Sequence, residues 1–108
     1  MADSYRDHFV QRLILNMLDV HLLRLVQNQP LWGYKIKKDI ATIFNLKIGH
    51  GLLYPTLNDL EEKGFLKSQK QTKSGRARKV YTITENGQKY IKSYYAVIGD
   101  QIDGNDLT

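Results

Sequence analysis

A run of basic residues between positions 67 and 79 is the strongest chemical signal in the amino-acid sequence, because no acidic residue interrupts it. Lysine and arginine side chains pair with phosphate oxygens, and a cluster of them is typical of proteins that bind nucleic acid. The chain of 108 residues also carries a net charge of +5. We therefore expect double-stranded DNA as the leading partner. The run consists of Lys67, Lys70, Lys73, Arg76, Arg78 and Lys79, and the expected DNA contacts within it are Lys70, Lys73, Arg76 and Arg78.

A second group of residues that could contact a duplex lies upstream of the basic run. Asn58 can form a pair of hydrogen bonds with adenine, and Tyr54 can contact a phosphate or a thymine methyl group. In the alternative interpretation, Tyr54 only covers the edge of the core and Asn58 is solvated. The expected contacts from this part of the chain are His50, Gly51, Tyr54, Pro55 and Asn58, with Lys35 and Lys38 before them.

The sequence contains no arrangement of residues that supports catalysis or a metal site. Its histidines are His8, His21 and His50, and no pair of them has the spacing of helical metal ligands. The chain lacks cysteine, which excludes thiolate metal sites, and it lacks the glycine patterns that bind phosphate or dinucleotides. No serine, histidine and aspartate are arranged as a nucleophile with its base. We therefore expect a protein that is not an enzyme and has no metal or cofactor.

Apolar residues recur at helical spacing along most of the chain, and this periodicity predicts the elements that position the candidate contacts. After a loose tail at 1–4, residues 5–28 form one long helix, or two helices joined near residue 18 with Asp19 as an N-cap. The next helix should bury Ile36, Ile40, Ile43 and Phe44. The later elements are a turn at 28–33, helices at 34–44 and 51–63, strands at 65–71 and 80–84, and a last helix at 85–103 with Thr84 as its N-cap.

The helix expected over 51–63 contains a proline. At 100° per residue, Leu53, Leu57 and Leu60 define the core side, whereas Gly51 and Pro55 point away from it. Proline lacks an N–H group and its ring presses on the carbonyl four residues earlier, which here belongs to a glycine. Acids lie only in the C-terminal half of the helix, so the N-terminal half can approach phosphates. Either the Gly51–Pro55 face lets the helix approach a duplex closely, which we favour, or a local bend is merely tolerated.

Two short helices with a tight connection, followed by a basic hairpin, form the arrangement of a winged helix-turn-helix. We therefore expect a mainly α fold with a small two-stranded β wing, in one domain that covers residues 1–108. Within it the helix-turn-helix occupies 33–64, the wing 65–84 and the C-terminal helix 85–103.

The N-terminal and C-terminal helices carry more apolar surface than one small domain needs. The apolar residues of these helices either pack on their own domain or pair with a second chain, and we favour a homodimer. The expected dimer contacts are Phe9, Leu13 and Met17 near the N-terminus, and Tyr90, Ile91, Tyr94, Tyr95 and Ile98 near the C-terminus.

Four segments resemble the PadR family of winged-helix transcriptional regulators. They are "PLWGYKIKKDI" at 30–40, "GLLYPTLNDLEEKGFL" at 51–66, "GRARKVYTITENG" at 75–87 and the helix that follows. The resemblance implies a dimeric DNA-binding repressor that dimerises through its C-terminal helix and often its N-terminal one. By position, Tyr54 and Pro55 match the recognition-helix motif, Gly75, Arg76 and Arg78 match the wing, and Gly33 and Tyr34 match the start of the second helix.

Two positions depart from the usual pattern of the PadR family. Members often have Ser or Thr where this chain has Leu52, so one polar DNA contact is missing. Ala77 replaces the common wing proline, which predicts a more mobile wing tip. The short C-terminal region argues against a large effector pocket, and the sequence identifies no effector. Trp32 and the tyrosines could line a small aromatic pocket, although we expect them to pack in the core.

The preferred interpretation is a homodimeric transcriptional repressor that binds an inverted-repeat operator in the cytoplasm. The alternatives are a winged-helix module that docks an acidic protein and a DNA-packaging protein that ignores sequence. No apolar run approaches the roughly 18–20 residues that span a bilayer, so we expect no membrane partner.

Overall fold

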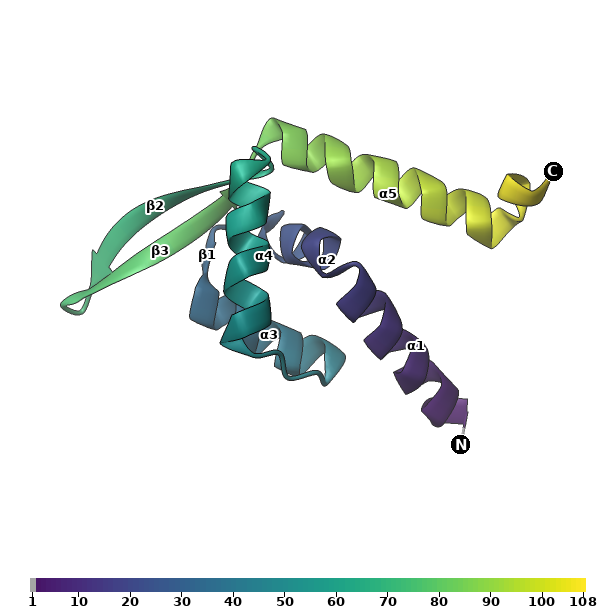
Figure 1. The fold of residues 1–108 in the computed structure, drawn as a ribbon, viewed down its shortest axis with the longest axis horizontal. Helices are drawn as coiled ribbons and strands as arrows, with labels where there is room; N and C mark the ends of the chain where they lie inside the picture. The colour runs from purple at the N-terminus through teal and green to yellow at the C-terminus, as the bar shows by residue number, and fades with distance from the viewer. Residues whose placement is uncertain (1) are drawn as a thin grey trace.

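The computed structural model describes residues 2–108, with side chains from Ser4 onward. The α1 and α5 helices extend away on one side of the molecule and the β2–β3 hairpin extends on the other, with α4 between them (Figure 1). The elements are α1 (Ala2–Asn16), α2 (Leu18–Val26), β1 (Leu31–Trp32), α3 (Gly33–Phe44), α4 (His50–Glu62), β2 (Leu66–Lys73), β3 (Arg76–Ile83), α5 (Glu85–Asp103) and the 3₁₀ helix η1 (Asn105–Leu107). None of the helices within residues 2–108 is long and apolar enough to cross a membrane.

The N-terminal region forms two helices, so the second of the two alternatives is correct. The break lies at Met17, whose backbone leaves the helical region at φ −118° and ψ 38°. Met17, not Asp19, therefore occupies the N-cap position. Asp19 lies in the first turn of α2, where its carboxylate accepts a hydrogen bond of 2.8 Å from the Val20 amide. The loose tail was also wrong for residues 2–4, which are helical, while Met1 lies outside the described residues.

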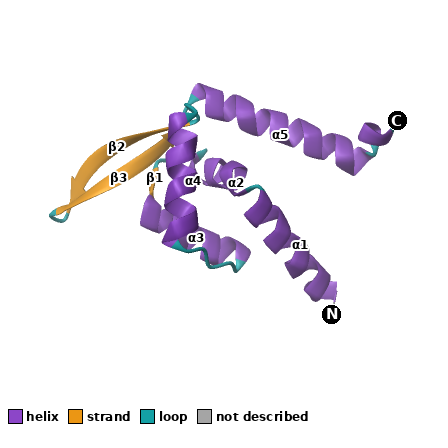
Figure 2. Ribbon diagram, in the orientation of Figure 1, coloured by secondary structure: helices purple, strands orange, loops and turns teal. Residues whose placement is uncertain are grey.

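The sheet has three antiparallel strands in the order β1-β3-β2, and not the two strands that the sequence predicted (Figure 2). The additional strand is only two residues long, with Leu31 opposite Tyr81 and Trp32 opposite Val80. Two residues that follow a proline give no strand periodicity, so the sequence indicated only a turn there. The hairpin is also longer than predicted. Ser74 and Gly75 form a two-residue turn with φ values of 54° and 77°, the conformation that suits a tightly paired hairpin.

The core lies where α2, α3, α4 and the base of the hairpin meet. Leu53, Leu57 and Leu60 of α4 are buried, which confirms the predicted core side of this helix. In α3, Ile36 and Ile40 are buried as expected. Ile43 is 60% exposed, so its predicted burial was wrong. It borders an open cavity between α1 and the end of α3 instead of packing in the core.

The end of α4, the start of β2 and the start of α5 meet at one tightly packed junction. Gly64 follows α4 with φ +80°, the left-handed conformation that ends a helix. The Thr84 hydroxyl donates a hydrogen bond of 2.6 Å to the Gly64 carbonyl and accepts one of 3.1 Å from the Gly87 amide, which confirms Thr84 as the N-cap of α5. At Gly87, α5 approaches the Phe65 carbonyl so closely that a Cβ atom would collide with it. The junction thus fixes α5 relative to the base of the hairpin.

Candidate nucleic-acid interface

The outer face of α4 presents the residues that the sequence predicted for it. Gly51, Pro55 and Asn58 are exposed, on the side away from the three buried leucines. The helix begins after Gly49, so Pro55 lies in its second turn, and α4 continues without interruption through the proline to Glu62. The proline therefore lies on the accessible surface, and the half of α4 that surrounds it contains no acid.

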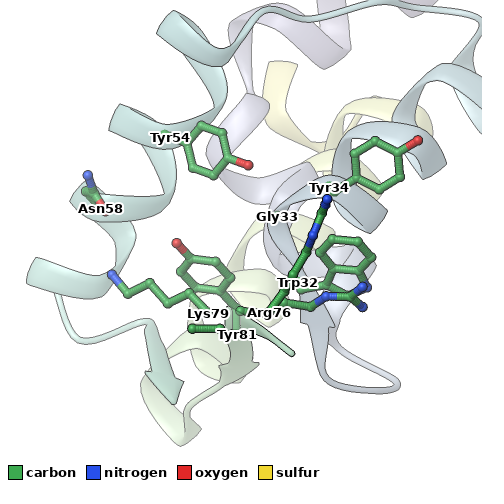
Figure 3. A pocket seen from close by; sticks show the side chains of 10 residues that line it. Trp32, Gly33, Tyr34, Tyr54, Asn58, Arg76, Lys79 and Tyr81 are labelled. Atoms are coloured by element: carbon green, nitrogen blue, oxygen red, sulfur yellow. The ribbon is translucent and has the colours of Figure 1, made fainter. Parts of the chain in front are cut away.

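Tyr54 points to the side, against α3, and does not stand on the outer face of α4. Its ring lies over Gly33, where a Cβ atom would come within 2.8 Å of the Tyr54 hydroxyl. The ring also stacks on His50, with 5.4 Å between centroids and 8° between planes. Tyr54 therefore covers the edge of the core and is half-buried. Its side chain also borders the groove between α4 and the hairpin (Figure 3).

This groove has a volume of about 680 Å³ and runs between α4, the start of α3 and strand β3. Strand β1 pairs only with Val80 and Tyr81, so one edge of β3 is unpaired from residue 79 to the tip. Aromatic and basic side chains surround this space (Figure 3). The sequence favoured core packing for Trp32 and the tyrosines. This holds for Tyr81, which is buried, but it was wrong for Tyr34, which is 56% exposed. The lining residues are Trp32, Gly33, Tyr34, Tyr54, Asn58, Arg76, Ala77, Arg78, Lys79 and Tyr81.

Arg78 is held in place by an aromatic stack. Its guanidinium carbon lies 3.8 Å from the centroid of the Trp32 ring, a distance at which a cation is attracted by the ring face. Trp32 in turn stacks on Tyr34, with 5.2 Å between the two centroids. The short strand β1 thus supports the basic hairpin by carrying Trp32. Sequence reasoning did not identify this role, because nothing in the pattern pairs residue 32 with residue 78.

Three further basic residues of the hairpin are free to meet an anionic partner. Lys70, Lys73 and Arg76 are exposed, and none of them belongs to an ion pair within residues 4–108. Arg76 and Lys73 face each other beside the turn, at the end of the hairpin farthest from the core. Like charges so close together repel, and an anion between them would relieve the repulsion.

A smaller basic depression of about 430 Å³ lies beside the N-terminus of α4. Lys38, a predicted contact, borders it and is exposed. Lys35 is not free in the same way, because its ammonium pairs with Asp39 at 2.7 Å. Sequence reasoning missed two further lysines. Lys37 lies with its ammonium 3.4 Å from His50 Nε2, and Lys47 borders the same depression from the α3–α4 connection. The available signal was that Lys37 is adjacent to the predicted contact Lys38 and that Lys47 lies in the connection between the two helices.

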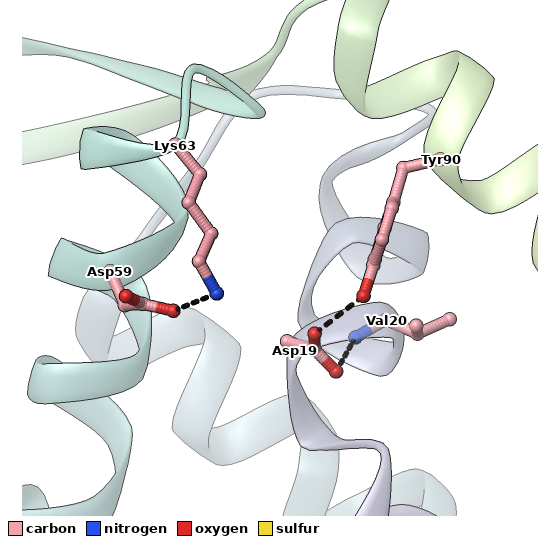
Figure 4. Close-up of polar contacts among 5 residues, drawn as sticks. All are labelled: Asp19, Val20, Asp59, Lys63 and Tyr90. Atoms are coloured by element: carbon pink, nitrogen blue, oxygen red, sulfur yellow. Dashed lines mark hydrogen bonds and ion pairs between the residues drawn. The ribbon is translucent and has the colours of Figure 1, made fainter.

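The acids in the C-terminal half of α4 are largely compensated by nearby lysines. Asp59 pairs with Lys63 at 2.8 Å (Figure 4). Glu61 accepts a hydrogen bond of 2.6 Å from the Ser68 hydroxyl and pairs with Lys79 at 3.1 Å. The Ser68 hydrogen bond and the nearby Lys79 hold the pKa of Glu61 below its ordinary value. Glu62 is exposed at the end of the helix.

The model of the transcriptional regulator PadR-like family matches residues 22–93, which extend from α2 into α5. The chain belongs to this family. This confirms the resemblance that the four sequence segments indicated, and the family is one of transcriptional regulators, not of enzymes.

Individual known proteins are similar to different parts of the chain. The transcriptional regulator Rv3488 of Mycobacterium tuberculosis is 32% identical over 69 residues, and the match covers 64% of each chain, less than two-thirds of that regulator. A PadR family regulator from Eggerthella lenta has a TM-score of 0.78 at 25% identity, over 98% of this chain and 93% of its own. Bacillus subtilis PadR in complex with operator DNA has a TM-score of 0.68 at 23% identity, over 72% of this chain and 46% of its own. The last comparison shows a shared fold.

In this PadR-like chain the candidate dimer residues fall into two groups. Phe9, Leu13 and Tyr95 are exposed, with 56%, 50% and 46% of their surface accessible. Met17, Tyr94 and Ile98 are half-buried. Further exposed apolar side chains on the two outer helices are Tyr5, Leu15, Val97 and Ile102.

Two residues predicted to face a second chain pack within their own. Ile91 is 1% exposed and belongs to the core, so its assignment to a dimer surface was wrong. Its position on α5 faces α2, which helical spacing along one helix cannot reveal. The Tyr90 ring stacks on Phe65 with 4.5 Å between centroids, and its hydroxyl donates a hydrogen bond of 3.0 Å to Asp19 (Figure 4). Tyr90 therefore fastens α5 to α2.

Proposed function

We propose that this PadR-like chain is a sequence-specific DNA-binding repressor that acts in the cytoplasm as a homodimer on an inverted-repeat operator. The single observation that carries the proposal is the groove between α4 and the basic hairpin. It joins an acid-free helix face to Arg76 and Arg78, neither of which belongs to an ion pair within residues 4–108. Phosphates supply the charge that this surface lacks, and an exposed helix of this kind fits the major groove.

In the proposed complex the N-terminal half of α4 enters the major groove and the hairpin serves as the wing. Asn58 reads a base edge, because a carboxamide can donate to and accept from adenine at once. Lys70, Lys73 and Arg76 contact phosphates or the neighbouring minor groove. Lys38, with Lys37 and Lys47, contacts the backbone beside the start of α4.

The proposed dimer forms through α1 and α5. The exposed apolar side chains of these two helices support it, because an isolated chain would leave Phe9, Leu13 and Tyr95 in water. Both helices extend from the side of the molecule away from the wing (Figure 1). A second copy docked there would leave both proposed DNA surfaces accessible, and two half-sites about one helical turn apart would suit such a dimer.

Footprinting of the purified protein on DNA upstream of its own gene tests the proposal, combined with a salt titration. If a dimer neutralises about 6–10 phosphates, affinity should fall about 10³–10⁵-fold between 50 and 200 mM salt. A protected inverted repeat is the expected result. Protection that random competitor DNA removes completely would favour a packaging protein. The absence of any protection at low salt would favour a protein-docking module.

A further inference from the structure

The carboxylate of Glu61 joins α4 to both long strands of the hairpin. One oxygen accepts a hydrogen bond of 2.6 Å from the Ser68 hydroxyl of β2, and the other lies 3.1 Å from the Lys79 ammonium of β3. Ser68 is opposite Tyr81 and Lys79 is opposite Lys70, so the two partners are diagonal neighbours on the same face of the sheet. A single side chain therefore contacts both strands from the helix, beyond the apolar base of the hairpin.

Two lysines that face each other in the hairpin give the Glu61 carboxylate a second effect, on the stability of the strand pair. Lys70 and Lys79 are direct cross-strand neighbours, and like charges placed opposite each other destabilise a strand pair. The Glu61 carboxylate lies next to Lys79 and offsets that repulsion. The Glu61 side chain is 29% exposed, so the solvent screens this interaction less than it would screen that of a freely exposed acid.

The opposite face of the hairpin has an anchor of its own. There the Arg78 guanidinium lies 3.8 Å from the centroid of the Trp32 ring, and Trp32 is paired with Val80 through β1. Glu61 therefore holds the hairpin on one face and Trp32 holds it on the other. Beyond them only the turn and the strand residues next to it project into solvent.

We propose that Glu61 is a positioning residue that sets the angle between the wing and α4, so that the wing cations and Asn58 reach the same duplex. This inference rests on the proposed function. It predicts an effect of Glu61 on DNA affinity that is opposite to the effect of its charge, because an acid on a DNA-binding surface should by charge alone weaken binding to phosphates. Here the acid strengthens binding, because the geometric effect outweighs the electrostatic one.

Glu61→Ala and Glu62→Ala form a matched pair for the test, because each removes one negative charge from adjacent positions of α4. Glu62 is exposed, and it forms no ion pair within residues 4–108. Glu62→Ala should leave operator affinity unchanged or tighten it by at most about threefold, since exposed charges are screened. Glu61→Ala should weaken it by roughly tenfold, which equals about 1.4 kcal/mol. Equal effects of the two substitutions would overturn the inference.

The salt dependence of binding reports whether the wing is the part that is lost. For Glu61→Ala the slope of log affinity against log salt should become shallower by about 0.9 for each phosphate contact that the wing gives up. A weaker affinity with an unchanged slope would contradict the proposed geometry. Glu61→Gln keeps an acceptor for Ser68 without the charge, and its affinity should lie between those of the wild type and Glu61→Ala.

Hydrogen exchange in the free protein tests the same inference without DNA. In Glu61→Ala the amides of β2 and β3 beyond Ser68 should exchange faster than in Glu62→Ala, while those of α4 remain protected. Unchanged exchange in the hairpin would overturn the positioning role, even if DNA binding fell. If the wild type binds no DNA, the proposed function fails, and the exchange measurement alone decides whether Glu61 fixes the wing.

Discussion

The ring of Tyr54 lies directly over Gly33, and a Cβ atom on residue 33 would come within 2.8 Å of both the Tyr54 hydroxyl and a ring carbon. The start of α3 and the first half of α4 can approach each other only because Gly33 has no side chain. This contact sets the distance between the two helices of the helix-turn-helix. It also places an aromatic wall on one side of the groove.

We expect Gly33→Ala to displace the Tyr54 ring and to weaken operator binding more than it weakens folding. The nearest atoms belong to the far end of a half-buried ring, which can turn away, so the stability loss should stay near the lower end of the roughly 1–3 kcal/mol typical of overpacking. Operator affinity and urea unfolding of the same preparation provide the measurement. Wild-type affinity in this variant would show that the ring position does not matter.

Gly87→Ala should be much more destabilising, because its Cβ would meet the Phe65 backbone carbonyl and lie 2.7 Å from Ile83 Cγ1. Backbone cannot rotate aside as a ring can, so we expect a loss of about 1–3 kcal/mol or more in the free energy of unfolding. Gly99→Ala, in the same helix with no atom near its added methyl group, is the control. It should gain about 0.5–1 kcal/mol from helix propensity. Equal unfolding midpoints for the two variants would refute the close approach.

His21 should make stability depend on pH below neutrality. It is 3% exposed, and burial, followed by the nearby Arg24, lowers its pKa from 6.5; Asp19 and the Leu13 carbonyl act in the opposite direction. The unfolded chain therefore takes up a proton that the folded chain does not. Stability should be fully present above about pH 6.5 and decline as the pH falls from there towards the folded pKa. Urea unfolding between pH 5 and 8 measures the slope.

Two histidine variants separate this effect from the titration of other groups. His21→Leu should flatten the dependence between pH 5 and 6.5, whereas His8→Gln, an exposed change on α1, should preserve it. Glu61, whose pKa is also lowered, contributes only at more acidic pH, below the ordinary glutamate value of 4.5. A slope that survives in His21→Leu would assign the effect to another group.

Pro55→Ala should stabilise the protein. It restores an N–H group that can donate to the Gly51 carbonyl and removes the ring that presses on that carbonyl, a gain of up to about 3 kcal/mol in a helix interior. Thr56→Ala, one residue further along α4, is a matched control that should change stability by less than about 1 kcal/mol. If Pro55→Ala left the urea midpoint where it was, α4 would already have adapted fully to its proline.

Arg76→Ala and Asn58→Ala should affect DNA binding in different ways. Loss of the exposed Arg76 cation should weaken binding to operator and random DNA alike and make the salt dependence shallower by about one unit. Loss of Asn58 should cost about 1–3 kcal/mol on the operator only, because base discrimination is lost. Competition assays with operator and random duplexes measure both. Equal losses on the two duplexes for Asn58→Ala would exclude a base-reading role.

The parts of the fold that sequence reasoning predicted are those set by local periodicity and capping. The leucine stripe of α4 repeats at helical spacing, and Thr84 has the side chain that an N-cap needs, so the structure contains both. The short strand β1 escaped prediction because its two residues are strand only through their pairing with Val80 and Tyr81. Ile91 and Ile43 were misplaced for a related reason, since spacing within one helix does not reveal which neighbour covers which side.

For the candidate site, residue type predicted which side chains lie on the surface, while contacts distant in sequence determined how they are held. Asn58, Lys73 and Arg76 are exposed as expected. The stacking of Arg78 on Trp32 and the bridge from Glu61 to Ser68 and Lys79 join segments whose relative placement only the folded chain defines. Tyr54 shows both effects. Its angle on the helix correctly predicted a position beside the outer face of α4, but the direction of its ring, over Gly33 of α3, depends on a contact distant in sequence.

The junction of Gly64, Thr84 and Gly87 sets the direction in which α5 extends from the domain. The helix has 19 residues, so it extends about 28 Å from that point, and a tilt of about 10° at its base would move its far end by about 5 Å. The same junction contains the base of the hairpin, which the Thr84–Gly64 hydrogen bond joins to the end of α4. Because Tyr90 and Ile91 also hold the first turns of α5 against α2, the position of the exposed apolar residues at the far end of the helix is set within a few residues of this junction.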